Sequence, residues 1–521
     1  MQKKLLYLLC LHIAAISTLF GETSFRSIYN DYYGYLTLSG IAEPLSLNYH
    51  SYSTDDARYS MEGGPWTDVA FEHSLLQSRY GEISLITTES WVSWNSATPY
   101  GRNDGAFWQG RGFNTRISGG FSFRNDFFSV TVAPEYWAAE NKDFDIIDTS
   151  SSGGYGDYWT VFDKLQRYGD DFYDDFNWGQ SEARFTWKNG FTAGFGNESI
   201  VVGPGHFNNI LLSDNAGGFP HFDMGTPGFV SLGKWGKAEA RGVWGYLHES
   251  DFFDDDGNND WAWFSGAYLG YAPPVISGLS LGMNYQYYKP LGEWDGWDLV
   301  RSIPGLDHSN SGTDSKDIMV SLTFDWLFPQ IGFEVYGEWA RNDNVVTFED
   351  LVHTPEHTNA LMLGVKQIIF SNRDVSVVMN FELTEMDQER TYYIRAAGPW
   401  YRHGGAGWTQ GYTNNGQLLG AAIGPGSRSQ TLAIDAYFGK GLFSFSMQRT
   451  SMDEDYYYQV LSSSTDFEKW VIGDVTLSGL YQFPAWSLFG GFSYSYNWDA
   501  RYLRDNDIMN ANLTIGASFD L

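Results

Sequence analysis

The sequence lacks three features that would place it in common protein classes. No run of eighteen apolar residues follows the N-terminus, so membrane-spanning helices are excluded. The single cysteine, Cys10, lies in the N-terminal apolar segment, which leaves no disulfide for the remainder of the chain. Basic residues are scarce, with 32 Lys and Arg against 63 Asp and Glu and a net charge of −31. Nucleic acid is therefore a poor candidate partner.

The N-terminus has the layout of a secretory signal peptide. Two lysines precede an apolar run over residues 5–16, and Ser17 and Gly21 are small residues near its end. We assign residues 1–21 to the signal and expect the mature protein to leave the cytoplasm.

Apolar and polar side chains alternate along most of the chain. In the last eleven residues, 511–521, every odd position is apolar and every even position is small or polar. In residues 331–339, Glu334 and Glu338 fall on the polar face, and each would cost roughly 2–4 kcal/mol if it faced lipid. This two-residue period predicts an all-β, antiparallel transmembrane β-barrel whose polar face lines the lumen.

Similar alternation over 128–132, 375–383 and 475–483 indicates further strands, and the spacing of segments gives about 16 to 20 strands in all. No linker or composition shift divides the chain, so residues 81–521 are expected to form one barrel with long acidic loops, such as 143–177 and 251–260. Residues 22–80 are less regular. They are expected to form an N-terminal periplasmic or plug-like segment with one short helix.

Four segments carry more information than a generic barrel requires. They are YGRNDGAFWQGRGFNTRISGG (100–120), FNWGQSEARF (176–185), GNESIVVGPGHFNNILLSDNAGGFPH (196–221) and PWYRHGGAGWTQGYTNNGQLLGAAIGPGSRSQ (399–430). In this order they resemble the Wzi family of capsule assembly proteins. The resemblance implies an outer-membrane barrel of about eighteen strands with a small helical periplasmic element. It also implies a lectin that holds capsular polysaccharide at the cell surface without catalysis.

Sugar recognition needs flat aromatic faces together with planar amide, carboxylate or guanidinium groups. The four segments supply both kinds of side chain. The alternative is that these residues form a satisfied polar network inside a filled lumen. The polysaccharide-binding candidates are Trp108, Gln109, Arg111, Trp178, Gln180, His206, Asn208, Asn209, Asn215, Arg402, His403, Gln410 and Tyr412.

Two catalytic patterns are present, but each lacks its required context. His353, Glu356 and His357 spell H-x-x-E-H, which binds zinc only on a helix, and Pro355 interrupts such a helix. Ser280 lies in G-x-S-x-G, which forms a nucleophile elbow only between a strand and a helix, whereas strand-like residues follow here. A lumen-facing strand residue is the favoured interpretation of Ser280.

An acidic string, Asp254, Asp256, Asn258 and Asp260, resembles the start of a calcium loop. Its sixth position is Asn259 rather than glycine, which favours a solvated loop. No metal ligands, cofactor or catalytic residues are therefore assigned.

We expect a monomeric outer-membrane barrel, in contact with outer-membrane lipids, that binds capsular or other surface polysaccharide and does not turn it over. Its acidic loops would repel an acidic polymer unless cations bridge the two or binding relies on stacking and hydrogen bonds. A porin-like channel for small solutes is the alternative. A hydrolase is the third class, and only Ser280 and scattered histidines support it.

Overall fold

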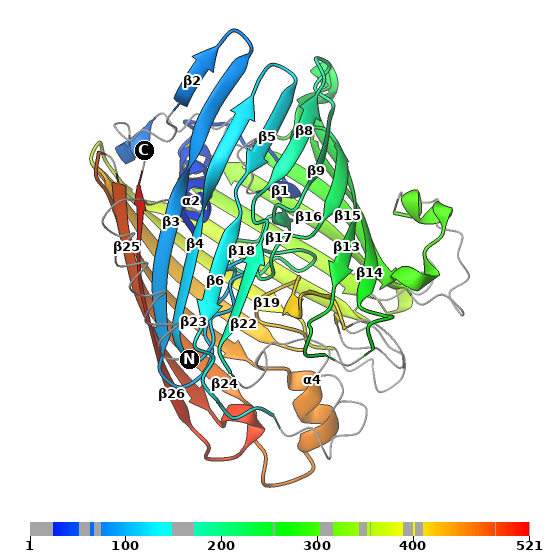
Figure 1. The fold of residues 1–521 in the computed structure, drawn as a ribbon, viewed down its shortest axis with the longest axis vertical. Coiled ribbons are helices and arrows are strands. Elements are labelled where there is room, and N and C mark those ends of the chain that lie inside the picture. Colours follow the sequence, from blue (N-terminus) through cyan, green and yellow to red (C-terminus); the bar gives the residue numbers. More distant parts are fainter. Residues whose placement is uncertain are drawn as a thin grey trace.

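The computed structural model describes residues 24–51, 63–66, 74–147, 171–253, 256–302, 316–342, 352–354, 356–388, 400–401, 410–484 and 486–519. Within these residues, antiparallel strands close into an eighteen-strand barrel (Figure 1). Closure is made by β26, which pairs with β3 from Asn512 opposite Asn95 to Phe519 opposite Thr88. The predicted fold class and strand number are confirmed.

Several strands of the wall are broken into two pieces, so the wall has more labelled pieces than strands. For example, β5 and β6 both pair with β4, and β11 and β12 both pair with β13. The pieces are β2 (Ser74–Ser78), β3 (Gly81–Asn95), β4 (Gly112–Arg124), β5 (Phe128–Val132), β6 (Glu135–Ala139), β7 (Tyr173–Asn177), β8 (Glu182–Thr186), β9 (Thr192–Gly196), β11 (His221–Gly225), β12 (Val230–Ser231), β13 (Lys237–His248), β14 (Trp261–Ala272), β15 (Leu279–Pro290), β16 (Asp317–Phe328), β17 (Phe333–Asn342), β18 (Asn359–Ser371), β19 (Val375–Glu385), β22 (Arg428–Phe438), β23 (Gly441–Ser451), β24 (Val471–Gln482), β25 (Trp486–Trp498) and β26 (Ile508–Phe519).

The alternation in sequence becomes an inside and an outside of the barrel. On β26, Asn510 and Asn512 are buried in the lumen, whereas Leu513 and Ile515 are exposed on the outer face. On β17, Glu338 faces inward and is 1% exposed, as expected for a carboxylate kept away from lipid. Ser280 is likewise buried on the inward face of β15.

Short turns lie at one end of the barrel and long connections at the other. Residues 329–332, 372–374 and 439–440 are short turns between neighbouring strands, whereas the connections after β6 and β19 are long. Bacterial barrels place short turns in the periplasm and long loops outside the cell. We therefore refer to the short-turn end as periplasmic and to the long-loop end as extracellular.

One acidic stretch is partly a strand rather than the expected loop. Within 143–177, the last five residues form β7 and pair with β6. They alternate, because Tyr173 packs edge-on against the buried Trp137 while Phe176 is exposed on the opposite face. Residues 148–170, and Asp254 of the acidic string, lie outside the described residues.

The helix α2 (Ser24–Leu38) lies inside the barrel near its periplasmic end (Figure 1). Gly40 lies two residues beyond its end, and its φ of +74° allows the N–H of Ile41 to bond the carbonyl of Leu36 at 2.9 Å, a C-terminal capping pattern that favours glycine. Among the described residues, no helix is both long and apolar enough to cross a bilayer.

Aromatic rings hold α2 against the wall. Tyr32 stacks on Trp66 of the short helix η2 (Gly64–Trp66) with ring centroids 4.3 Å apart, and Trp66 donates from Nε1 to the carbonyl of Gly441 at 3.0 Å. Tyr35 reaches Ser376 of β19 through an oxygen–oxygen contact of 2.8 Å. These buried rings also pack on Tyr437 of β22.

Two inner segments, 197–219 and 410–427, fill the middle of the lumen. The first contains β10 (Ile200–Val202), which pairs with β1 (Tyr49–Ser51), and the second contains the hairpin of β20 (Thr413–Asn414) and β21 (Gln417–Leu418). Their apolar residues form a buried cluster with inward-facing residues of β13 to β18. The remaining short helices are η5 (Gly233–Trp235), η6 (Leu291–Glu293), η7 (Gly296–Leu299), α4 (Glu454–Tyr456), η9 (Tyr457–Leu461) and η10 (Ala500–Tyr502).

Carboxylates of the wall hold the segment 197–219 and the N-terminal segment in place. Glu382 of β19 accepts hydrogen bonds from the backbone N–H groups of His206 at 2.8 Å and Asn208 at 2.9 Å. Glu239 of β13 accepts in the same way from Leu47 at 3.0 Å and Asn48 at 2.8 Å. Inward carboxylates thus bond the loop backbone whose N–H groups no strand satisfies.

Candidate functional site

Two cavities lie in the barrel on either side of residues 102–105, which line both. The outer cavity, of about 150 Å³, lies toward the extracellular end between the loop 98–109, the segment 417–423 and the ends of β24 to β26. The inner cavity, of about 560 Å³, lies toward the periplasmic end between α2, the segment 201–214 and the wall.

The outer cavity combines aromatic rings with amide groups. Trp108 and Trp470 both line it, and Trp470 is oriented by a 3.2 Å hydrogen bond from Nε1 to Oδ1 of Asn497. Asn497 and Asn510 add amides, and Arg501 adds a guanidinium. This is the mixture of stacking surface and planar polar groups that a sugar ring requires.

Several buried polar atoms of residues that line the outer cavity have no hydrogen-bond partner in the described part of the chain, among them Nδ2 of Asn510 and Oγ1 of Thr450. The other amide atom of Asn510, Oδ1, accepts from the backbone N–H groups of Ala97 at 2.8 Å and Thr98 at 3.2 Å. That contact fixes the direction of the amide and leaves its N–H₂ group as a donor for a ligand. Buried polar groups are normally paired, so such atoms are candidate ligand contacts.

An ion pair forms part of the partition between the two cavities. Arg102 reaches Asp474 of β24 at 2.7 Å, and Asp474 also accepts a hydrogen bond from Ser495. Asp104 accepts from Nε2 of Gln109 at 2.8 Å. Burial raises the pKa of Asp104 to about 6, although the Gln109 bond opposes this shift.

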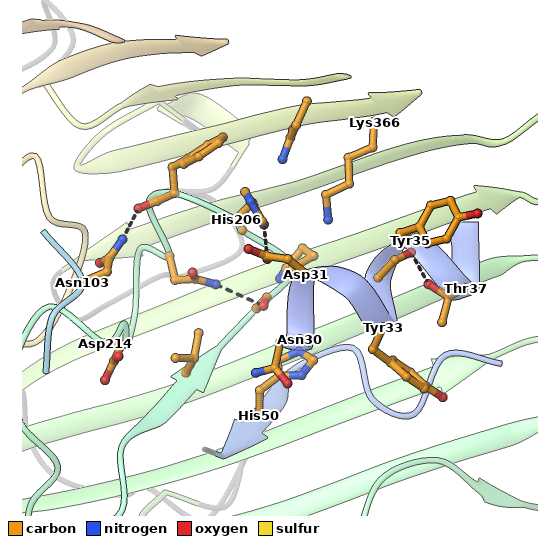
Figure 2. Close-up of a pocket in the computed structure, with 18 of the residues that line it drawn as sticks. Asn30, Asp31, Tyr33, Tyr35, Thr37, His50, Asn103, His206, Asp214 and Lys366 are labelled. Atoms are coloured by element: carbon orange, nitrogen blue, oxygen red, sulfur yellow. Dashed lines mark hydrogen bonds and ion pairs between the residues drawn. The ribbon is translucent and has the colours of Figure 1, made fainter. Parts of the chain in front are cut away.

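The inner cavity is dominated by charged and titratable groups. Figure 2 shows Asp31 of α2 and His206 of the 197–219 segment facing each other, with Lys366 of β18 nearby. Nδ1 of His206 lies 3.4 Å from Oδ1 of Asp31, and Lys366 lies 4.0 Å from Glu334. Asp325 and Asp435 also line this cavity, which is therefore acidic overall.

Burial determines the protonation of the groups that are not on strands. It raises the pKa of Asp31 to about 8, with a further contribution from the charge of Asp435. Burial lowers the pKa of His206 to about 3, and the charge of Lys366 acts in the same direction. Burial also raises the pKa of Asp214 to about 8. At neutral pH, Asp31 and His206 therefore meet as a neutral pair.

One group in the described residues has the spacing of a metal site. Glu198, His221 and Asp223 each offer a ligand atom within 4.8 Å of the others. However, Arg184 bonds Asp223 at 2.8 Å and 3.0 Å, and Arg241 bonds the same carboxylate. Two guanidinium groups already satisfy the carboxylates that a cation would need, so these residues suit an ion-pair network better than a metal.

The structure divides the predicted sugar-binding residues among several places. Trp108, Gln109 and Asn215 line the outer cavity, whereas Gln180, His206 and Asn209 line the inner cavity. Arg111 bonds the carbonyl of Ser96 at 3.4 Å at the edge of the loop, and Trp178 is 59% exposed beside the outward-facing Phe176. Arg402 and His403 lie outside the described residues.

Three other candidates belong to the packed interior. Tyr412 is fully buried, and its hydroxyl donates to the carbonyl of Leu211 at 2.8 Å. Gln410 accepts from the N–H of Ser250 at 3.0 Å, and Asn208 donates to Ser429 at 3.3 Å. Each of these side chains holds an inner segment in place.

Sequence reasoning missed Trp470, Asn510 and Arg501, which line the outer cavity from β24, β26 and their connections. Asn510 could have been found as a polar residue on the lumen face of the last strand. Nothing in the sequence indicates that the connection at 98–109 folds over it.

Comparison with known proteins bears on the fold. No protein-family model matches the sequence, and no curated protein matches it. Wzi, an outer-membrane protein involved in group 1 capsule assembly in Escherichia coli and a carbohydrate-binding β-barrel, superposes with a TM-score of 0.55 at 13% identity, over 83% of this chain and 85% of that one. The fold resembles that of Wzi.

Other solved barrels superpose less well. OccAB2 of Acinetobacter baumannii gives a TM-score of 0.41 at 8% identity, over 84% of this chain and 98% of that one. OccK2 of Pseudomonas aeruginosa gives 0.41 at 10% identity with the same two coverages.

Proposed function

We propose that this protein is an outer-membrane, lectin-like barrel that binds surface polysaccharide, helps assemble or anchor a capsule and does not turn its ligand over. The supporting observation is the outer cavity, where tryptophan rings, amides and unsatisfied polar atoms such as Nδ2 of Asn510 meet at the extracellular end. The fold shared with a carbohydrate-binding barrel gives further support.

The filled lumen argues for binding rather than passage. The inner segments pack against the wall through one buried apolar cluster. At the periplasmic end, α2 packs against the wall through a second cluster. An eighteen-strand barrel is wide enough for an aqueous channel, but here the inner segments and α2 occupy much of that space. We therefore place the porin-like channel second.

Binding of purified capsular polysaccharide to the folded protein, followed by calorimetry or on a glycan array, tests the proposal. Deletion in a capsulated strain should release polysaccharide into the medium while its synthesis continues. Unchanged cell-associated polysaccharide, or large ion-conducting steps in a planar bilayer, would favour the channel instead.

A further inference from the structure

The connection between β15 and β16 begins with a segment, residues 291–302, that folds onto the outside of the barrel. We name this segment the outer shelf. It covers Trp263 and Tyr287, two side chains that point outward from β14 and β15 but are only 4% and 0% exposed. In Figure 1 its short helices lie beside the wall, outside the barrel, in bright green. The shelf therefore occupies surface that would otherwise face lipid.

Asp298 attaches the shelf to the wall. Its carboxylate contacts Nζ of Lys289 at 2.7 Å and Nη1 of Arg301 at 2.7 Å, and it accepts from the hydroxyl of Tyr287 at 3.0 Å. Arg301 also binds Asp295 at 2.9 Å. Lys289 and Arg301 are thus paired with Asp298 and Asp295, which leaves the shelf without an unpaired cation for a phosphate or an acidic peptide.

An apolar groove of about 340 Å³ opens beside the shelf on the same outer wall. It forms because β9 and β11 are five residues long while β13 and β14 are twelve, so the chain turns into the lumen at Gly196 and the wall is lower there. The side chains around it come from the wall and from the shelf: Phe195, Phe222, Met224, Trp244, Trp263 and Leu299.

The position of the groove indicates what fills it. Trp244 and Trp263 lie in the extracellular halves of their strands, so the groove lies at the level of the outer leaflet. Trp294 and Trp297 of the shelf are 42% and 71% exposed, as expected for tryptophans at a membrane interface. A stable protein interface buries about 800 Å² per partner, which is far more than this groove offers.

We propose that the groove holds one acyl chain of an outer-leaflet lipopolysaccharide, with Leu299 of the shelf at one edge of the groove. The apolar lining matches a hydrocarbon chain, and the paired charges of the shelf leave the chain rather than the headgroup as the recognised part. The proposal rests on the outer-membrane placement of the proposed function but not on polysaccharide binding.

Native mass spectrometry of the full-length mature protein in detergent, with rough-type lipopolysaccharide or phosphatidylglycerol added, tests it. The wild type should retain one lipopolysaccharide per barrel. Leu299→Glu should bind it at least tenfold more weakly, because the substitution places a charge at the edge of the groove. Leu232→Glu is the matched control, since Leu232 is 47% exposed in a periplasmic turn and Leu299 is 48% exposed.

Heat-modifiable gel migration checks that each variant folds. If Leu299→Glu does not fold, the same binding measurement is made on Phe222→Ala, which shortens another side chain that lines the groove. Phosphatidylglycerol also offers an acyl chain, so its retention should fall in Leu299→Glu as that of lipopolysaccharide does. Equal retention in the variants and the control, or a protein dimer in place of bound lipid, would each overturn the proposal. Polysaccharide binding by Leu299→Glu should equal that of the wild type, which separates failure of this site from failure of the proposed function.

Discussion

Asp31 of α2 lies 3.4 Å from Nδ1 of His206, and this contact joins the N-terminal helix to the inner segment 197–219. Because burial raises the pKa of Asp31 to about 8 and lowers that of His206 to about 3, both groups are neutral at pH 7. The contact is then one between a protonated carboxyl and a neutral imidazole. The helix is thus held by aromatic rings and a neutral polar contact rather than by an ion pair.

Docking of α2 should weaken as the pH rises. The pKa of Asp31 is 3.8 in the unfolded chain and about 8 in the folded one, so the folded state binds more protons between these values. The free energy of unfolding therefore falls as the pH rises from about 4 to about 8. Asp31→Asn should reduce this dependence by the part that Asp31 contributes, while Asp214, whose pKa is also raised to about 8, keeps its own part. Asp374→Asn, at an exposed turn residue, should leave the dependence unchanged. The rate of protease cleavage near α2, measured from pH 5 to pH 9, reports how firmly the helix is docked. An unchanged pH profile in Asp31→Asn would contradict the raised pKa of Asp31.

The amide donor of Asn510 should contribute to polysaccharide binding. Asn510→Asp keeps an oxygen for the N–H groups of Ala97 and Thr98 but replaces the unsatisfied N–H₂ group with an acceptor. Loss of one hydrogen bond costs about 0.5–1.5 kcal/mol, so we expect binding up to about tenfold weaker.

Asn512→Asp is the control for that experiment, because Asn512 lies two residues further on the same face of β26 and bonds Asn95 rather than lining the cavity. Titration calorimetry with the same polysaccharide compares the two variants. Equal losses in both would show that the effect comes from the strand and not from the cavity.

Tyr412 should hold the lumen closed. It packs against Tyr288 and Tyr401 with ring centroids 5.1 Å and 5.7 Å away, and its hydroxyl bonds Leu211 and Gln286. Truncating a buried aromatic side chain costs about 3–5 kcal/mol, which should loosen the inner segments. Tyr412→Ala should therefore raise single-channel conductance above that of the wild type.

Tyr481→Ala is the matched control for conductance, since Tyr481 is 45% exposed on the outer face of β24. If Tyr412→Ala conducts no more than Tyr481→Ala but loses polysaccharide, Tyr412 is a sugar contact and not a structural residue of the interior.

The barrel could be predicted from sequence because lipid imposes a strict rule on each strand. Residues such as Leu513 and Ile515 must be apolar because they face the bilayer, whereas their neighbours Asn512 and Thr514 face the lumen and can be polar. The two-residue period can therefore be recognised in a single strand, without knowledge of the strand it pairs with. A helix in the N-terminal segment could also be predicted, because Tyr32, Tyr35 and Leu36 have the three- and four-residue spacing of one buried helix face.

The site was less predictable, because its residues come from distant parts of the chain. Trp108 and Gln109 were found from a motif, but Trp470 and Asn510 join them only through the way loops fold over the barrel. The sequence also could not separate sugar contacts from interior residues. The side chains of Gln410 and Tyr412 suit either a sugar contact or the packed interior. Only their burial in the structure shows that they belong to the interior.

Arg184 should be essential for a stable wall. It bonds Glu182 at 2.9 Å and both oxygens of Asp223, and it lies 3.4 Å from Glu198, all of them buried. Removing one partner of a buried ion pair leaves uncompensated charge and costs about 3–5 kcal/mol. Arg184→Ala should therefore lower the free energy of unfolding by about that amount.

Arg504→Ala serves as the comparison, because Arg504 is 46% exposed and its 3.2 Å contact with Glu468 lies in solvent, where such pairs contribute about 0–1 kcal/mol. Urea titration of the refolded protein in lipid vesicles measures both variants. A loss below about 1 kcal/mol in Arg184→Ala would mean that Arg241 alone neutralises Asp223. In that case the cluster of Glu198, His221 and Asp223 would have carboxylate oxygens free for a cation, and zinc should then raise the unfolding midpoint of Arg184→Ala but not that of the wild type.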